Sequence, residues 1–345
     1  MTSSSAAEAT QPVAFASSRR IQDADLDRVA AAVRGWETRL TQLAPGQGHG
    51  NIAETFLPSA RLVRLVVDTP VALEALPRAP RPDQVLRIGT ISPGSGSLLW
   101  QGISVRPEML MLMEGGKPSR FALPAGCELL VARLDRTRIE ALSRLLGSSD
   151  DEPAGRRTQL RPQSAPVLAA LRAQLRILVR GDLAGHGEGP AVDDLYERVA
   201  SMLAVPPAPL QPSPATRRRA LCRAEDYMDA HARERISLSD LCKAAECCER
   251  TLRHAFRECY GTTPMAFLQK LRLQGLRQDL RDAAPHDATI LRLALRWGFW
   301  HMGHLGRAYK TLFGETPSET LLRNPLADLL EGLERAEARP GPSAA

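Results

Sequence analysis

The sequence predicts an α+β protein of two domains, with a β-barrel or β-sandwich in the N-terminal part and an all-helical domain in the last third. Short apolar and alternating runs, separated by glycine and proline clusters, fill residues 54–142, a pattern typical of short strands joined by turns. Five prolines then occur among the nine residues 206–214, where a helix cannot continue. Beyond this segment the apolar residues recur at helical spacing.

Local patterns define the remaining elements and the divisions of the chain. Apolar residues at helical spacing predict an amphipathic helix over 21–43 and two further helices over 167–183 and 192–203, whereas the polar run 147–161 predicts a loop. The predicted divisions are a disordered tail (1–20), a β-rich domain (21–150), a helical segment (151–204), a proline-rich linker (205–216), a helical domain (217–323) and a C-terminal tail (324–345).

The positive charge is concentrated in the last third. Residues 217–323 hold 19 lysines and arginines against 13 acids, whereas the rest of the chain holds 26 of each. A polyanionic partner would therefore bind the last third, although a solvated basic surface would give the same charge.

No apolar run reaches the roughly 20 residues that span a bilayer. Since the N-terminus does not resemble a secretory signal, we expect a cytoplasmic protein without membrane contact.

Enzyme chemistry is not indicated. The sequence contains no Walker loop, nucleophile elbow or dinucleotide fingerprint. A metal-dependent β-barrel enzyme needs clustered histidines and a carboxylate, and residues 1–216 contain only His49 and His186. We therefore expect no catalytic site, no cofactor and no metal.

Residues 237–261 predict a helix-turn-helix. Ser237 and Asp240 have the spacing of a capping box, which begins a short helix. A turn at 246–247 leads to a second helix over 248–259, which Gly261 ends. The inward positions of the second helix are Leu252 and Phe256, and its basic residues on other faces are Arg250, Arg253, His254 and Arg257. Such a helix fits the major groove, where arginine binds guanine through two hydrogen bonds.

The same pattern recurs about 53 residues later in the chain. Helices predicted over 288–296 and 300–313 flank a turn at 297–299. The spacing of an aromatic, a glycine and a proline is identical in the two units, at Phe256, Gly261 and Pro264 and again at Tyr309, Gly314 and Pro317. An internal repeat is stronger evidence for tandem helix-turn-helix units than either unit alone.

With this repeat, the last third resembles the AraC/XylS family of regulators over about 107 residues. The motif similar to the family signature runs from Ile290 to Ser318 and includes Gly298-Phe299, Leu305, Tyr309-Lys310 and Phe313-Gly314-Glu315-Thr316-Pro317-Ser318. In that family the two recognition helices of one monomer enter successive major grooves. The resemblance implies DNA-reading residues Arg250, Arg253 and His254 in the first unit, and Met302, His304 and Arg307 in the second.

Three positions depart from the family pattern. Cys248 replaces the usual N-cap serine, Cys242 stands where many members have alanine, and Gly303 offers no side chain to a base. We therefore expect the first unit to read bases, and the second to bind phosphates, chiefly through Arg307 and Lys310. Arginines at these positions could also be solvated surface residues, and Met302 could simply pack.

The six cysteines do not have the spacing of a zinc site. Cys242, Cys247 and Cys259 fall at small or apolar positions, where cysteine behaves as a small hydrophobe. Only Cys248 lies at a helix N-terminus, where the pKa of a thiol tends to fall. It supports a hypothesis of thiol-redox regulation.

The resemblance also implies the rest of the architecture and the function. The N-terminal domain would be a cupin-like barrel that binds a small effector, followed by helices that form a homodimer. The protein would bind promoter DNA and RNA polymerase as a regulator, more often an activator. Gly298–His304 is similar to a branch with ethanolamine-operon and catabolic regulators, which favours a small metabolite as the effector.

Alternatives are a constitutive regulator with an empty barrel, a redox-responsive regulator without a small-molecule ligand, and a DNA-repair alkyltransferase. The last needs an N-terminal cysteine cluster, whereas residues 1–216 contain only Cys127.

Overall fold

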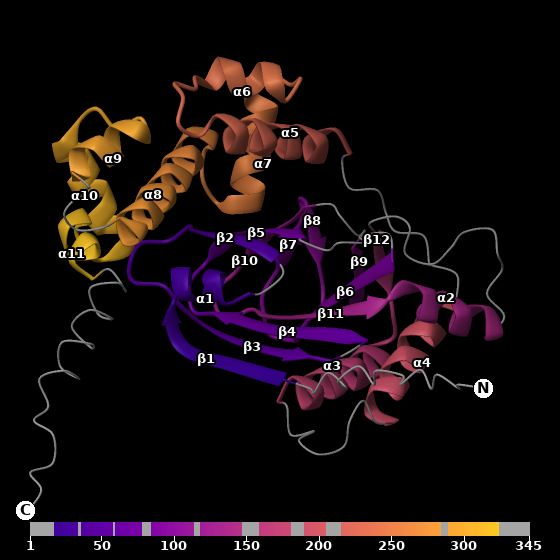
Figure 1. Ribbon diagram of the computed structural model, residues 1–345. Coiled ribbons are helices and arrows are strands. Elements are labelled where there is room, and N and C mark those ends of the chain that lie inside the picture. The colour runs from indigo at the N-terminus through magenta and orange to yellow at the C-terminus, as the bar shows by residue number, and fades with distance from the viewer. Residues whose placement is uncertain are drawn as a thin grey trace, which may run out of the picture.

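The computed structural model describes residues 17–33, 36–57, 59–77, 84–113, 118–146, 159–180, 190–204, 215–283 and 289–323. A β-rich N-terminal domain lies below a helical C-terminal domain in Figure 1. The predicted fold class, a β-barrel or sandwich followed by an all-helical domain, is confirmed. The predicted proline-rich linker, apart from its last two residues, and the C-terminal tail lie outside the described residues.

Two antiparallel sheets form the N-terminal domain. The seven-stranded sheet has the order β1 (Ser17–Asp25), β3 (His49–Phe56), β4 (Ala60–Val67), β11 (Glu128–Asp135), β6 (Val85–Ile91), β9 (Met109–Met113) and β12 (Gln159–Pro162). The five-stranded sheet has the order β2 (Trp36–Gln42), β5 (Val71–Pro77), β10 (Ser119–Leu123), β7 (Leu98–Trp100) and β8 (Ile103–Val105).

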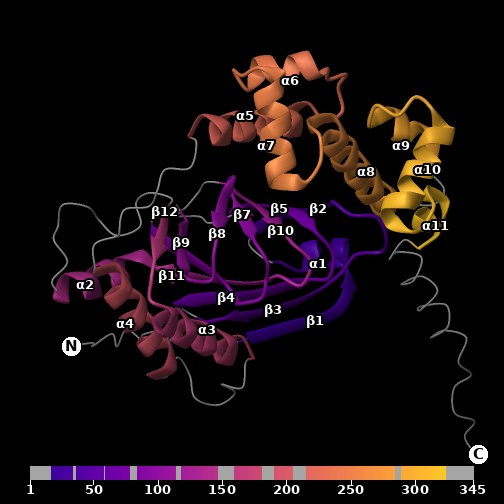
Figure 2. The ribbon, with the colours of Figure 1, turned by 180° about the vertical axis from the view of Figure 1, so that it is seen from behind.

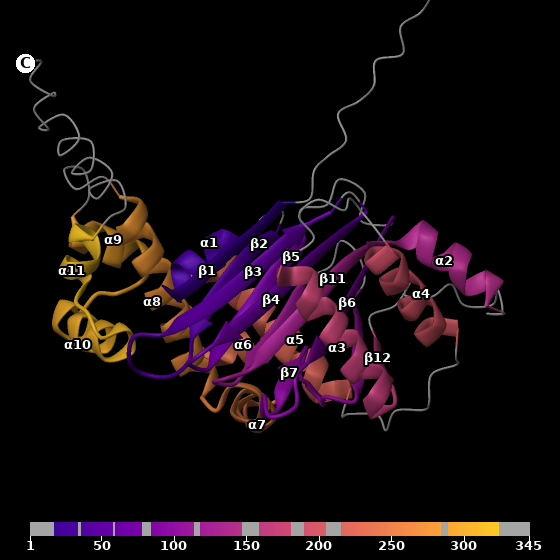
Figure 3. The same cartoon turned by 90° about the horizontal axis from the view of Figure 1, so that it is seen from below.

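The middle strands of the seven-stranded sheet are buried on both faces, whereas the edge strand β1 is mostly exposed. Along β9, Met111 and Met113 pack into the core between the sheets, whereas Leu110 and Leu112 pack against helices on the outer face. Those helices are α2 (Arg136–Leu145), α3 (Ala165–Arg180) and α4 (Pro190–Ala204), seen over the sheet in Figure 3. Burial on both faces explains why β6 and β9 have continuous rather than alternating apolar runs.

Helices α3 and α4 confirm the two helices predicted after the β-rich region. The leucines of α3, among them Leu168, Leu171 and Leu175, are buried against the sheet of the same chain. The apolar stripe expected to dimerise is therefore used within the chain, and Ile177 is its exposed member.

Three local predictions in the N-terminal domain are wrong. Residues 21–43 form β1, the short helix α1 (Leu26–Ala32) and β2 rather than one helix. The spacing that suggested a helix holds only around Leu26 and Val29, whereas β2 pairs along its length with β5. Residues 17–20 belong to β1 and not to the tail, because they pair with β3. Residues 159–161 of the predicted loop belong to β12, where buried Leu160 packs into the core.

Seven helices are described in the C-terminal domain: α5 (Ala215–His231), α6 (Leu238–Ala244), α7 (Glu249–Tyr260), α8 (Pro264–Asp282), α9 (Ile290–Arg296), α10 (Met302–Phe313) and α11 (Pro317–Leu322). They form two small cores. One gathers around Leu252 and Phe256, and the other around Leu305 and Tyr309. Helix α8 connects the two units, as Figure 2 shows from behind. None of the helices among the described residues is both long and apolar enough to cross a membrane.

The internal repeat is confirmed in three dimensions. Gly261 ends α7 with a φ of 64°, and Gly314 ends α10 with a φ of 73°. Both angles lie in the left-handed region that favours glycine at a helix end. Thr263 and Thr316 then cap α8 and α11, each of which begins with proline.

Candidate nucleic-acid interface

The first helix-turn-helix unit consists of α6, a turn at 245–248 and α7. Ser237 and Asp240 form the predicted capping box at the start of α6. The inward residues Leu252 and Phe256 are fully buried. The Phe256 ring meets Phe267 of α8 edge-on at 5.4 Å between ring centroids. This packing leaves the opposite face of α7 exposed.

The exposed face of α7 is a basic groove. The three residues predicted to read DNA in this unit, Arg250, Arg253 and His254, line it together. Its other lining residues are Arg217, Glu249, Thr251 and Arg257. Arg253 Nε donates to Glu249 Oε1 at 2.6 Å, one turn earlier on the same helix. This ion pair orients the guanidinium along the helix surface.

The second unit consists of α9, a turn at 297–301 and α10. Gly298 turns the chain with a φ of 77° beside the guanidinium of Arg272. The inward residues Leu305 and Tyr309 are buried. Tyr309 Oη lies 2.8 Å from Thr320 Oγ1, which in turn lies 2.8 Å from Glu315 Oε1. This hydrogen-bonded chain fixes α10 on α11.

The residues predicted to read DNA in the second unit divide into two groups. His304 and Arg307 are exposed on α10, whereas Met302 is half-buried and packs against the core. A Cβ added at Gly303 or Gly306 would meet nothing within 4 Å. Helix α10 therefore exposes a flatter and less charged surface than α7.

The N-termini of both recognition helices lack a side-chain cap. The side chains of Cys248, at the start of α7, and His301, at the start of α10, make no capping hydrogen bond to the backbone of the first turn. The first backbone N–H groups of a helix have no partner within the helix and attract anions. Both recognition helices thus begin with a surface suited to a phosphate.

The thiols have different environments. Cys242, Cys247 and Cys259 are partly buried against the core of the first unit, as predicted, and burial raises the pKa of Cys259 to about 12. Cys248 is exposed, and hydrogen bonds with Thr251 lower its pKa. Among the described residues, no three histidine, cysteine or acidic side chains gather as a metal site.

A short helix, a tight turn and a second helix with an exposed polar face occur twice, joined by α8, and define a tandem helix-turn-helix DNA-binding domain. The family described as "helix-turn-helix domain" matches residues 241–323. The chain is 37% identical over 102 residues to the "probable thc operon regulatory protein" of Rhodococcus erythropolis, covering 30% of this chain and 31% of that protein. It is 32% identical over 99 residues to the "XylDLEGF operon transcriptional activator" of Pseudomonas putida, covering 29% of this chain and 31% of that protein.

A solved structure also matches. It is a "probable AraC family transcriptional regulator" from Rhodopseudomonas palustris, 36% identical to this chain over the aligned region. The alignment covers 30% of this chain and 96% of the other chain, with a TM-score of 0.29. The helical domain of this chain is of the AraC/XylS type, as in these transcriptional regulators. The matched segment spans about a third of the length of the curated relatives.

The sequence did not predict one lining residue of the basic groove. Arg217 lies in α5, outside the predicted helix-turn-helix, yet lines the same groove as Arg253. Its position before the first unit gave no signal, because the packing of α5 on α7 brings it there. Sequence reasoning also missed the contacts between the helical domain and the five-stranded sheet.

Proposed function

We propose that this protein is a sequence-specific transcription regulator that acts as an activator. It would bind promoter DNA through both helix-turn-helix units. The observation that carries the proposal is the basic groove of α7, which gathers Arg250, Arg253 and His254 on one exposed helix. Arginine can bind guanine O6 and N7 with two hydrogen bonds, each such pair contributing roughly 1–3 kcal/mol of discrimination.

The second unit has a complementary role in this proposal. His304 and Arg307 are exposed and would contact DNA, while half-buried Met302 would reach it only from the edge of α10. Arg307 and Lys310, together with the helix N-terminus, would bind phosphates. An activator's partner is RNA polymerase, and the similar Pseudomonas putida protein is named a transcriptional activator. This function belongs in the cytoplasm.

Selection from a random DNA library tests the proposal. The full-length protein should enrich one sequence, and its affinity for that sequence should fall steeply with salt because lysines and arginines displace counterions from phosphates. Competition with unrelated DNA measures specificity. Enrichment of no sequence would contradict the proposed function.

We further propose that the N-terminal domain binds a small apolar effector between its two sheets. A cavity there is lined by apolar side chains from both sheets, with Thr38 the polar exception: Val33, Thr38, Ile52, Val63, Leu65, Leu73, Ala75, Met113, Phe121, Leu129 and Val131. Apolar lining favours a ligand that loses little hydration on entry.

The cavity can be tested by filling it. Ala75→Phe places a ring among the lining residues, whereas Ala30→Phe changes a helix that packs on the same core from outside the cavity. An effector found by screening small metabolites for a thermal shift should lose its shift in Ala75→Phe and keep it in Ala30→Phe. An unchanged shift in Ala75→Phe would place the effector elsewhere.

We also propose that the protein forms a homodimer. The exposed Ile177 on the outer side of α3 is the apolar residue of that helix available to a second chain. Because one chain already carries two recognition helices, dimerisation is not required for contact with two grooves. Sedimentation with and without DNA measures the oligomeric state, and a monomer under both conditions would contradict the dimer.

Thiol-redox control is the second candidate function. The favouring observation is Cys248, exposed at the start of α7 with a lowered pKa and beside the DNA-reading Arg250. Oxidation there would place a larger polar group at the DNA-facing end of the helix. Peroxide should lower the DNA affinity of the wild-type protein and leave Cys248→Ser unaffected. Equal loss in both proteins would exclude Cys248 as the sensor.

A further inference from the structure

Three strands of the five-stranded sheet align a row of charged residues. In the strand register, Arg39 of β2 lies opposite Glu74 of β5, and Glu74 lies opposite Arg120 of β10. Their strand neighbours point the other way, into the core between the sheets: Leu40, Leu73 and Phe121. Because side chains alternate along a strand, the row Arg39–Glu74–Arg120 faces the helical domain.

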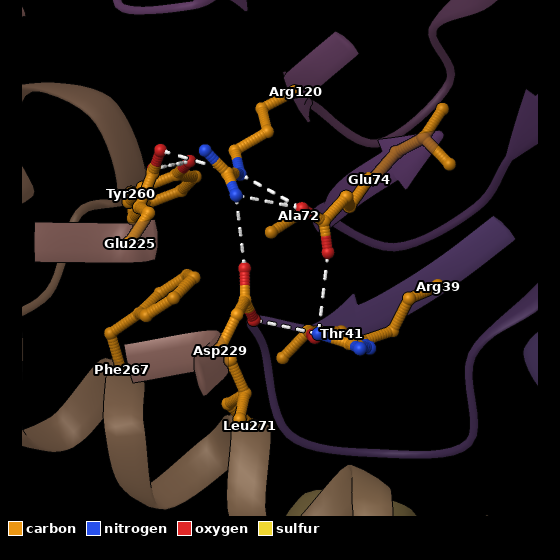
Figure 4. Close-up of a pocket in the computed structure, with 11 residues that line it drawn as sticks. Arg39, Thr41, Ala72, Glu74, Arg120, Glu225, Asp229, Tyr260, Phe267 and Leu271 are labelled. Atoms are coloured by element: carbon orange, nitrogen blue, oxygen red, sulfur yellow. Dashed lines mark hydrogen bonds and ion pairs between the residues drawn. The ribbon is translucent and has the colours of Figure 1, made fainter. Parts of the chain in front are cut away.

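The row meets acidic residues of α5. Arg120 Nη1 lies 2.7 Å from Asp226 Oδ1, and Arg120 Nη2 lies 3.1 Å from Asp229 Oδ2. Arg39 Nη1 lies 2.6 Å from the other oxygen of Asp229. Figure 4 shows Arg39 and Arg120 of the N-terminal domain converging on Asp229 of α5. The Arg120 side chain is only 14% exposed, so this contact is far better shielded from solvent than a surface ion pair.

The same cluster reaches the C-terminal end of the first recognition helix. Tyr260, the last residue of α7, donates a hydrogen bond to buried Glu225 of α5. Glu225 Oε2 in turn lies 3.8 Å from Arg120 Nε. The first unit is therefore anchored through α5 and through the end of α7 together.

The N-terminal domain caps the second recognition helix directly. Gln42 Nε2, at the end of β2, donates to the carbonyl oxygen of Leu312 at 2.6 Å. The backbone N–H of Gly46 donates to the carbonyl of Thr311 at 3.3 Å. The last carbonyls of a helix have no partner within it. At the end of α10, residues of the other domain supply two of the missing donors.

The connecting helix α8 contacts the N-terminal domain through polar residues on one of its faces. Lys270, Gln274, Arg277 and Arg281 are spaced by three or four residues, so they lie on one face. Arg277 Nε and Arg281 Nε lie 3.1 Å and 3.2 Å from Asp27 Oδ2. Here the arginines belong to the helical domain, whereas in the Arg39–Glu74–Arg120 row they belong to the N-terminal domain. The two sets of ion pairs between the domains therefore have opposite arrangements of charge. Such complementary charges fix how one domain sits on the other.

We propose that the N-terminal domain sets the mutual orientation of the two recognition helices, and that Arg120 and Gln42 are positioning residues for DNA reading. Arg120 holds the first unit through α5 and the end of α7, and Gln42 holds the second unit at the end of α10. Neither residue lies on the exposed faces assigned to DNA. This inference rests on the proposed function, since orientation matters only if both units bind one DNA.

The test measures how DNA affinity depends on the distance between the two half-sites. Inserting two base pairs rotates one half-site by about 70° relative to the other, because a turn takes roughly 10.5 base pairs. The probe is the DNA sequence that the full-length wild-type protein enriches from a random library, with zero to five base pairs inserted. The variants are Arg120→Gln, Gln42→Ala and Gln42→Glu, the last nearly isosteric but unable to donate to the Leu312 carbonyl. The control is Arg106→Gln, an exposed arginine that follows β8.

The wild-type protein and Arg106→Gln should lose affinity by about tenfold or more on insertion of two base pairs, a penalty of roughly 1.4 kcal/mol. Arg120→Gln and both Gln42 variants should bind the original sequence but show penalties below about threefold. A thermal unfolding curve for each variant separates loss of fold from loss of orientation.

Insertion profiles identical to the wild type in folded variants would overturn the inference and show that α8 alone sets the orientation. If the wild-type protein enriches no sequence, the proposed function fails instead, and the inference falls with it.

Discussion

In the first helix-turn-helix unit, α7 exposes Arg250, His254 and Arg257, whereas in the second unit α10 exposes Gly303, His304 and Arg307. The scaffolds match closely. Gly261 and Gly314 end the two recognition helices in the same left-handed conformation. The inward-facing residues and turns are therefore repeated, and the residues that we propose to face DNA are not.

This difference assigns different tasks to the two units. A helix rich in arginine can distinguish bases by paired hydrogen bonds. A helix surface with glycine has no side chain at that point, but it allows the backbone to approach a neighbour closely. We therefore expect the first unit to supply most of the sequence specificity, and the second to supply affinity and register.

The largest expected effect separates the two recognition surfaces. Arg253→Ala combined with His254→Ala removes two groups from the α7 groove, and each lost base contact should cost roughly 1–3 kcal/mol of DNA-binding free energy. Met302→Ala combined with His304→Ala should cost less, because Met302 is half-buried. Fluorescence anisotropy on the selected sequence and on unrelated DNA measures both. Equal losses, or a larger loss in the second unit, would reverse the assignment.

The anchor of the first unit should make the stability of the protein depend on pH. Burial raises the pKa of Glu225 to about 7 from its ordinary 4.5, against the lowering effect of Arg120. The neighbouring groups are Glu74, Asp229 and Tyr260. Between these two pH values the folded protein keeps a proton that the unfolded chain has lost. The free energy of unfolding should therefore fall as pH rises from 4.5 to 7, by about 1.4 kcal/mol per pKa unit.

Glu225→Gln removes this titration and keeps the shape of the side chain. Thermal unfolding at pH 5.5 and pH 8 should show a smaller decline for Glu225→Gln than for the wild type. An identical decline in both proteins would show that Glu225 is already ionised in the folded state at pH 5.5.

A substitution at the N-cap of α7 should change the stability of the protein by a smaller amount. The Cys248 side chain makes no capping hydrogen bond to a backbone N–H of the first turn, whereas a serine hydroxyl at this position can accept one. Cys248→Ser should raise the free energy of unfolding by about 1 kcal/mol. Chemical denaturation measures the change, and Cys247→Ser, within the turn, serves as the control without a cap to gain. A neutral or destabilising Cys248→Ser would mean that the Cys248–Thr251 contact already satisfies this end of the helix.

The smallest effect tests the flat surface of α10. Gly303 is helical and has open space around it, so Gly303→Ala should stabilise the protein by roughly 0.5–1 kcal/mol. We expect the same substitution to lower DNA affinity, because the added methyl group stands between α10 and DNA. Half-buried Gly306 provides the comparison, where Gly306→Ala should stabilise without lowering affinity. Unchanged affinity in Gly303→Ala would show that α10 does not approach DNA at this position.

The sequence predicted the helical domain well because its signals are local. A glycine at a helix end, a threonine or serine cap and apolar residues at i, i+4 act within a few residues of one another. Tyr309, Gly314 and Pro317 could be assigned from spacing alone, and the structure places them as expected.

The N-terminal domain was predicted less well because strand pairing is not local. Residues 21–43 carry a short helical pattern, but β2 is held by β5, some thirty residues away in the chain. The Arg39–Glu74–Arg120 row depends on the register of three strands, which spacing does not reveal. Nor did any sequence signal mark Gln42 as a cap for α10, because the contact joins two domains.

Hydroxyl-radical footprinting of the full-length protein on its selected DNA tests the central claim most directly. For each bound chain we predict two protected segments on one face of the DNA, about one helical turn apart. Arg253→Ala with His254→Ala should remove protection from one segment and weaken the other. A single protected segment, or protection unchanged in this double variant, would contradict an account in which both units of one chain read DNA.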